Sequence, residues 1–76
     1  MRCIGIIGAM EVEVASLKER MKDVQVVHKA SMEFYAGMLE NKNVVVVRSG
    51  IGKVNAAVCT QILIDDFKAE AVINTG

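Results

Sequence analysis

The sequence contains no proline, a single histidine and only two cysteines among its 76 residues. The absence of proline argues against a linker inside the chain, and the short length allows one domain at most. Cys3 and Cys59 have no partner at metal-ligand spacing, so two buried thiols are expected in preference to a disulfide or redox pair. His28 is expected to be a surface residue without a catalytic role.

The sequence also lacks an excess of charge, because nine basic and nine acidic residues give a formal net charge of zero. These residues are interspersed, so no surface for nucleic acid or for an anionic membrane is predicted. No apolar run reaches the ~18 residues of a membrane span, and the first residues do not resemble a signal peptide. The expected location is therefore the cytoplasm.

Apolar residues are abundant and make up 53% of the chain. Residues 44–47 and 71–73 form unbroken apolar runs, which are typical of strands buried on both faces. Such strands need a covering layer on each side, and the chain offers only two good helix candidates. We therefore expect the sheet to lack some of its neighbours if the 76 residues stand alone.

The spacing of apolar residues predicts five strands and two helices in the order β-α-β-β-β-α-β. Strands are expected at residues 2–8, 24–27, 33–39, 44–47 and 71–74. The first helix is expected to have its apolar stripe at Met10, Val14, Leu17 and Met21. The second is expected to have it at Val54, Ala57, Val58 and Ile62. This order predicts an α/β fold with hairpins in the middle of the chain and a mixed sheet flanked by helices.

Three of the predicted strands end in segments with small residues, at positions 8–11, 49–52 and 74–76. In open α/β sheets, ligands bind beyond the carboxyl ends of strands, where loops lead into helices with free backbone N–H groups. Small residues such as Ala9 would allow the backbone to approach a ligand closely. Ordinary turn geometry would explain any single glycine in these segments. It explains less readily that small residues occur at all three strand ends.

Two nucleotide-binding motifs are excluded at these segments. A Walker A loop needs a glycine before its Gly-Lys pair and a hydroxyl residue after it, but these positions are Val47 and Val54. The glycines at positions 5 and 8 do not complete a G-x-G-x-x-G fingerprint, and no acidic residue follows at a second strand end. Binding of NAD is therefore not expected.

Two glutamates lie in the first turn of the first helix, where a carboxylate complements the helix dipole and a purely structural role would explain both. On a helical wheel Glu11 points away from the apolar stripe, whereas Glu13 borders it. Glu13 is therefore expected to be partly buried at the ligand edge and Glu11 to be solvated. An ionised carboxylate in that place can act as a general base toward water. Elsewhere, Phe34 and Met38 are expected in the core rather than in a ligand pocket.

Three motifs together resemble a known family in order and spacing. They are G-I-I-G-A-M-E-V-E-V at residues 5–14, S-G-I-G-K-V-N-A-A at 49–57 and I-N-T-G at 73–76. They resemble the N-terminal third of bacterial 5'-methylthioadenosine/S-adenosylhomocysteine nucleosidases. The resemblance implies the purine nucleoside phosphorylase-like fold, with residues 1–76 as the N-terminal part of a single nucleosidase domain.

The resemblance also implies hydrolysis of the N-glycosidic bond of adenosyl thioethers in methionine salvage, by a homodimer that uses no metal or organic cofactor. The second glutamate of the family's G-A-M-E-x-E pattern activates the attacking water, and that residue is Glu13 here. Ala9, Met10 and Ile51 are implied to contact the substrate. Family members often carry a further glutamate at the position of Val12, which is not the catalytic one. The groups that bind and protonate adenine lie beyond residue 76, so the separate chain is expected to be inactive.

Two alternatives remain at this point. A nucleoside phosphorylase of the same fold would use phosphate in place of water, with Arg48 and Lys53 as the available basic side chains. Glu13 would repel phosphate there, which favours hydrolysis. Outside the enzyme class, the chain could be a non-catalytic fragment that acts only after assembly with another chain.

Overall fold

The computed structural model describes residues 3–8, 10–48 and 53–75. Its elements are β1 (Cys3–Gly8), α1 (Glu11–Arg20), β2 (Lys22–Lys29), β3 (Met32–Leu39), β4 (Lys42–Arg48), α2 (Lys53–Asp65) and β5 (Ala71–Asn74). The predicted order of elements is confirmed, although β2 is longer at both ends than the predicted strand at residues 24–27. Neither helix, within the part of the chain described, is long and apolar enough to cross a membrane.

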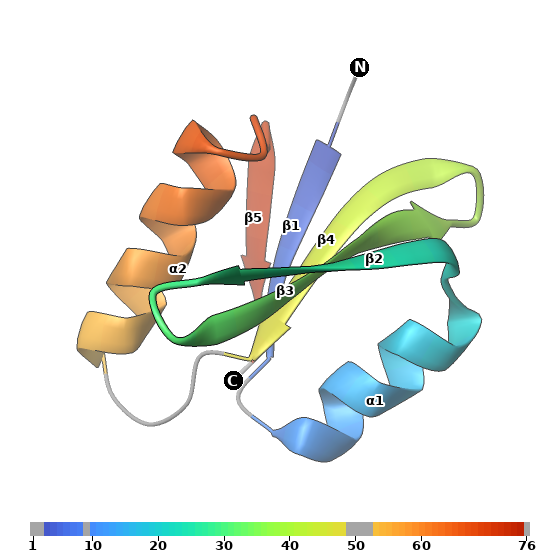
Figure 1. Cartoon of the computed structure of the whole chain (residues 1–76), viewed down its shortest axis with the longest axis horizontal. Coiled ribbons are helices and arrows are strands. Elements are labelled where there is room, and N and C mark those ends of the chain that lie inside the picture. Colours follow the sequence, from blue (N-terminus) through green and yellow to red (C-terminus); the bar gives the residue numbers. More distant parts are fainter. Residues whose placement is uncertain (1–2, 9, 49–52, 76) are drawn as a thin grey trace.

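The strands form one mixed sheet in the order β2-β3-β4-β1-β5. β1 pairs in parallel with β4 and β5, whereas β2, β3 and β4 form the two predicted antiparallel pairs. The carboxyl ends of β1, β4 and β5 therefore lie at one edge of the sheet, where Gly8 is in register with Arg48 and Ile7 with Asn74. Both helices begin at this edge (Figure 1).

The valines of β4 contribute to two apolar cores, one under each helix. Successive side chains of a strand point to opposite faces of the sheet. The valines at 44 and 46 accordingly pack in the cluster that contains Val14 of α1, and those at 45 and 47 pack with Cys59 and Leu63 of α2. All four valines are at most 4% exposed, so the prediction that this strand is buried on both faces is confirmed.

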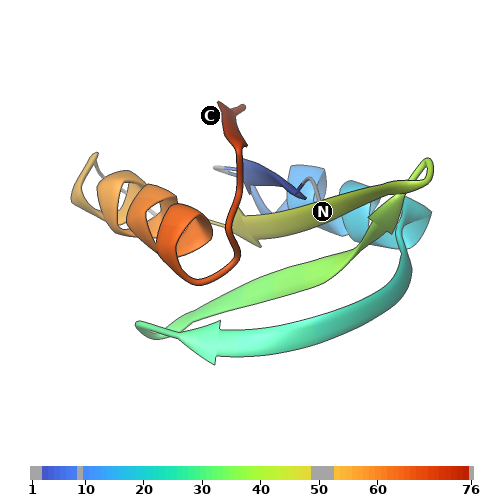
Figure 2. The ribbon, with the colours of Figure 1, turned by 90° about the horizontal axis from the view of Figure 1, so that it is seen from above.

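The sheet twists strongly, so that β2 and β3 cross the direction of β5 at a large angle (Figures 1 and 2). Two contacts tie this hairpin to the segment that follows α2. The rings of Phe34 and Phe67 stack with their centroids 5.4 Å apart, and Lys29 Nζ lies 3.0 Å from Asp66 Oδ2. Phe34 is fully buried, which confirms its predicted place in the core.

The prediction that residues 71–73 are buried on both faces is wrong. Ala71 is exposed, Val72 is half-buried and Ile73 is 50% exposed. The reason is the place of β5 at the end of the strand order, where, among the strands described, it pairs with β1 alone. An apolar run is buried on both faces only where neighbouring layers exist to cover it.

The predicted stripe of α1 is confirmed at its centre and wrong at its start. Val14 and Met21 are buried and Leu17 is half-buried, but Met10 is 61% exposed. Met10 is the N-cap residue, with φ −111° and ψ 139°, so its extended backbone directs it away from the helical stripe. The stripe therefore begins one turn later than the spacing predicts.

The predicted face of α2 is wrong at Ala57 and Val58, which are exposed, whereas Cys59 and Leu63 are completely buried. Ile62, predicted on the same face, is half-buried and packs against the core, and the side chain of Val54 lies outside the described residues. Apolar residues occur on every side of this helix, including Ile64, which is 46% exposed. Such a helix presents several equivalent apolar stripes, and only the packing against the sheet selects one.

Candidate active site at the carboxyl edge of the sheet

The ends of β1 and β5 are joined at the candidate site by hydrogen bonds to one carbonyl group. The backbone N–H of Thr75 donates to the Ile7 oxygen at 2.9 Å, and the Thr75 hydroxyl donates to the same oxygen at 3.3 Å. A Cβ atom at Gly8 would lie only 2.9 Å from Val14 Cγ2. Glycine at this position thus lets the first turns of α1 pack closely against the end of β1.

The first turn of α1 carries both candidate carboxylates. Met10 gives the helix no side-chain cap, although its carbonyl accepts a hydrogen bond from the Val14 N–H at 3.3 Å. Glu11 and Glu13 follow it in the turn where negative charge stabilises a helix. Glu13 is half-buried and Glu11 is exposed, as the helical wheel predicts.

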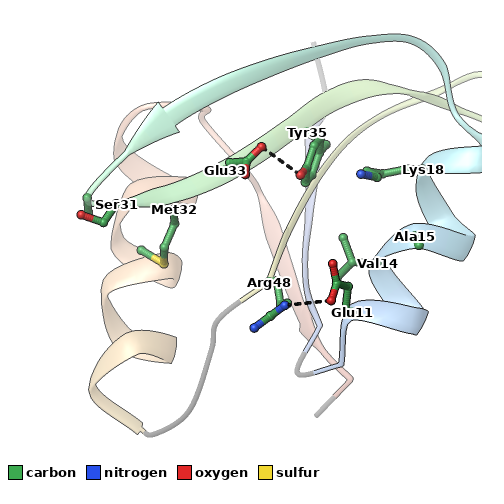
Figure 3. Close-up of a pocket in the computed structure, with 10 residues that line it drawn as sticks. Glu11, Val14, Ala15, Lys18, Ser31, Met32, Glu33, Tyr35 and Arg48 are labelled. Atoms are coloured by element: carbon green, nitrogen blue, oxygen red, sulfur yellow. Dashed lines mark hydrogen bonds and ion pairs between the residues drawn. The ribbon is translucent and has the colours of Figure 1, made fainter.

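An ion pair connects this turn to the end of β4. Arg48 Nη1 lies 3.4 Å from Glu11 Oε2 (Figure 3). Both partners face solvent, because 51% of the Arg48 side chain and 83% of the Glu11 side chain are exposed. This ion pair could not be predicted from the sequence, because it depends on the parallel register that places Gly8 beside Arg48.

A cleft of about 430 Å³ opens beside this ion pair, between α1 and the turn that joins β2 to β3. Its lining consists of Glu11, Val14, Ala15, Lys18, Ala30, Ser31, Met32, Glu33, Tyr35 and Arg48. Within it, Lys18 Nζ lies 4.1 Å from the centroid of the Tyr35 ring, and the Tyr35 hydroxyl donates to Glu33 Oε2 at 3.1 Å (Figure 3). Glu13 does not line this cleft, so its carboxylate lies on another side of the helix start.

The structure places two of the four predicted site residues. Met10 and Glu13 lie together at the start of α1, next to the end of β1. Ala9 and Ile51, predicted to contact the substrate, lie outside the described residues. Arg48 and Glu11 are additional charged groups at the same edge. Their positions next to the glycine-containing strand ends are the feature of the sequence that could have identified them as site residues.

The remaining reactive side chains lie away from this edge or on the surface. His28 is exposed on β2, as predicted. Both cysteines are free, with Cys59 fully buried and Cys3 half-buried, so the prediction of two buried thiols is confirmed fully for Cys59 alone. Burial raises the pKa of both thiols. Cys59 Sγ lies 3.2 Å from Met32 Sδ in the core, which is the environment of an unreactive thiol.

Comparison with known proteins agrees with the fold and with the motifs. The sequence matches the phosphorylase superfamily over residues 3–76. It is 53% identical over 73 residues to the 5'-methylthioadenosine/S-adenosylhomocysteine nucleosidase of Staphylococcus epidermidis, a match that covers 96% of this chain and 32% of that protein.

Solved structures of nucleosidases show the same arrangement of elements. The enzyme from Colwellia psychrerythraea 34H in complex with adenine matches with a TM-score of 0.93 and 52% identity, over 99% of this chain and 31% of that one. The enzyme from Neisseria meningitidis in complex with methylthio-immucillin-A also gives a TM-score of 0.93, at 46% identity, over 100% of this chain and 33% of that one.

The chain therefore spans about a third of the length of the relatives it matches. The mixed sheet with flanking helices is the part of the fold that it shares with them, and the resemblance of the chain to the nucleosidases is confirmed. On its sequence and on its fold, the chain belongs to the phosphorylase superfamily.

Proposed function

We propose that this chain is the N-terminal part of a single α/β domain in a nucleosidase for 5'-methylthioadenosine and S-adenosylhomocysteine. The names of the similar proteins and the adenine and methylthio-immucillin-A bound in two of their structures support this substrate class. The observation that carries the proposal is the half-buried carboxylate of Glu13 in the first turn of α1. It lies at the sheet edge where three parallel strands end.

Glu13 acts as the general base in the proposed reaction. A water molecule attacks the anomeric carbon of the ribose, its proton passes to the Glu13 carboxylate, and the electron pair of the breaking C–N bond leaves with adenine. The transition state carries positive charge on the sugar, which a nearby carboxylate stabilises. A base placed in this way typically contributes about 10²- to 10⁴-fold to the rate.

The rest of the active site is proposed to come from outside these 76 residues. Adenine needs a proton as it leaves, and we expect the group that donates it, like the groups that hold the base, beyond residue 76. The separate chain is therefore expected to have no nucleosidase activity. Ala9, Met10 and Ile51 are proposed to line the substrate on the side of this chain.

The proposed setting is a cytoplasmic homodimer that acts in methionine salvage. The reaction needs water, a base and an acid, and the proposal includes no metal or organic cofactor. Among the residues that the structure describes, no group of three or more histidine, cysteine, aspartate or glutamate side chains could hold a metal ion.

A phosphorylase is the second candidate, because the superfamily bears that name. Phosphate would need a free cation at the strand ends. Of the two basic residues predicted there, Arg48 is paired with Glu11, and the side chain of Lys53 lies outside the described residues. The Glu13 carboxylate adds a second negative charge to the same helical turn. Among the side chains described, the charges of this edge therefore favour water as the nucleophile.

An assay of adenine release distinguishes the two candidates. A full-length enzyme that carries this chain is given methylthioadenosine in buffer with and without inorganic phosphate. Release of adenine and methylthioribose without phosphate supports the proposal. Strict dependence on phosphate, with methylthioribose 1-phosphate as product, would establish the phosphorylase instead, and no cleavage under either condition would refute both.

A further inference from the structure

Gly8, the last residue of β1, packs closely against the first turns of α1. A Cβ atom at this position would lie 2.9 Å from Val14 Cγ2, closer than such atoms approach each other in proteins. The next nearest atoms described, Thr75 Oγ1 at 3.8 Å and the Met10 carbonyl oxygen at 4.0 Å, would be ordinary contacts. The φ of Gly8 lies outside the left-handed region, so the backbone itself is compatible with alanine. Among the residues described, Val14 is therefore the one that requires glycine here.

Val14 cannot easily turn away from a methyl group at position 8. Its side chain is branched at Cβ, and a β-branched residue in a helix is largely restricted to one χ1 rotamer. It is 4% exposed and packs in one cluster with Met21 and with Val44 and Val46 of β4. A methyl group at position 8 would therefore displace the first turns of α1 rather than the Val14 side chain alone.

The end of β1 is held by the strands on both of its sides, β4 and β5. Gly8 pairs in register with the last residue of β4. The carbonyl of Ile7 accepts hydrogen bonds from the Thr75 N–H at 2.9 Å and from the Thr75 hydroxyl at 3.3 Å. The helix is not part of these ladders, so it is the element that would move. Glu13 directly precedes Val14 in α1 and would move with it.

We propose that Gly8 and Val14 are positioning residues for the carboxylate of Glu13. Their contact sets how closely the first turns of α1 approach the sheet, and so where the half-buried Glu13 lies at the carboxyl edge. The inference rests on the proposed function, in which Glu13 takes the proton of the attacking water. Because misplacement of a catalytic group by about 1 Å can cost about 10²-fold in rate, this contact affects turnover as well as stability.

The test uses substitutions in a full-length enzyme that carries this chain. Gly8→Ala, Val14→Ala and the double variant Gly8→Ala/Val14→Ala are compared with the wild type in the hydrolysis of methylthioadenosine. Gly5→Ala is the matched control, because it places the same methyl group on the same strand but against Leu63, which packs in the other cluster of the core. Steady-state kinetics give kcat and KM, and the melting temperature is measured for each variant.

We expect Gly8→Ala to lower kcat by about tenfold or more and to change KM by less than about threefold. Once Val14 is truncated, the added methyl group meets no close atom among those described, so the double variant should turn over within about threefold of Val14→Ala. Gly5→Ala should keep the wild-type kcat.

Three results would overturn the proposal. The first is an equal loss of kcat from Gly8→Ala in the presence and in the absence of the Val14 side chain. The second is a rise in KM alone, because the glycine would then serve the approach of the substrate. If Gly8→Ala does not fold, the double variant and Val14→Ala still decide the matter. Failure of the double variant to fold, while Val14→Ala folds, is the third result.

A second comparison distinguishes this inference from the proposed function. Gly8→Ala is added to Glu13→Gln, in which no base remains to be misplaced. Residues that act as a unit have non-additive effects, so the addition should lower kcat by less than about twofold. A further loss as large as that in the wild type would show that position 8 acts through another group, and would overturn the inference alone. Absence of hydrolysis by the wild type, or unchanged turnover of Glu13→Gln, would instead refute the proposed function without any change at position 8, and this inference with it.

Discussion

Glu11 and Glu13 lie in the same helical turn but in different surroundings. Their exposure follows from the 100° rotation between successive helical residues, a local property that the sequence alone predicts. The ion pair between Glu11 and Arg48 could not be predicted in this way, because it requires the parallel register of β1 and β4. At the scale of single residues, the difference in exposure between these two glutamates was therefore predictable, and the contact of Glu11 with a distant segment was not.

The role of Glu13 is tested by Glu13→Gln in a full-length enzyme. The amide keeps the shape of the side chain but cannot accept the proton of the attacking water, so turnover should fall at least about a hundredfold. Binding of a substrate analogue and the melting temperature should stay close to those of the wild type. Steady-state kinetics with Glu19→Gln as control decide the matter. Equal and small losses in the two variants would show that Glu13 only stabilises the helix start.

We predict that position 37 in β3 requires glycine, because the backbone of the neighbouring strand β2 lies too close for a side chain. A Cβ atom there would lie 2.8 Å from the Lys22 carbonyl oxygen and 3.2 Å from Val24 Cα, where the pairing of β2 with β3 is irregular. Since backbone atoms cannot move aside easily, Gly37→Ala should lower the free energy of unfolding by about 1–3 kcal/mol.

Gly5→Ala is the matched control for this effect. Its Cβ atom would lie 2.8 Å from Leu63 Cδ1, which is a side-chain atom and can shift more easily than backbone. Urea unfolding of the two variants should therefore show the larger loss for Gly37→Ala. A loss in Gly5→Ala that equals or exceeds it would contradict the assignment of the backbone contact as the critical one.

At the scale of elements, predictions of burial depended on how the apolar residues are distributed over the faces of each helix or strand. β4 was predicted correctly because four consecutive valines place apolar side chains on both faces, and both faces are covered. Two exposed residues of α2, Ala57 and Val58, were predicted on its buried face because apolar residues occur all round this helix. β5 has the composition of a central strand but lies at the edge, which only the strand order reveals.

The orientation of α2 can be tested by truncating two side chains of similar size to alanine. Leu63 is fully buried and Ile64, its neighbour in sequence, is 46% exposed. Leu63→Ala should lower the free energy of unfolding of the chain by about 2–5 kcal/mol, since it leaves a cavity against the sheet. Ile64→Ala should change it by less than about 1 kcal/mol. Urea unfolding followed by circular dichroism compares them, and equal losses would contradict the observed face of the helix.

On the scale of the whole molecule, the two edges of the sheet differ in character. β2, at one edge, carries exposed charged side chains such as Lys22, Asp23 and Lys29. β5, at the other, has the sequence Ala-Val-Ile-Asn without a charge. Charged side chains discourage pairing with another chain, whereas an apolar edge favours it. The prediction that the sheet would lack neighbours therefore concerns the β5 edge in particular.

The last prediction follows from this asymmetry and concerns the 76-residue chain on its own. Its β5 edge should bind a hydrophobic dye and support self-association, because Ile73 is half exposed on a strand that, among those described, pairs with β1 alone. Ile73→Lys should weaken association by about tenfold or more, since pairing would bury a charge. Val26→Lys places the same charge on β2, where Val26 is 47% exposed, and should have little effect. Analytical ultracentrifugation separates these cases: a wild-type monomer that binds no dye, or two lysine variants that behave alike, would show that β5 is not the edge through which the chain associates.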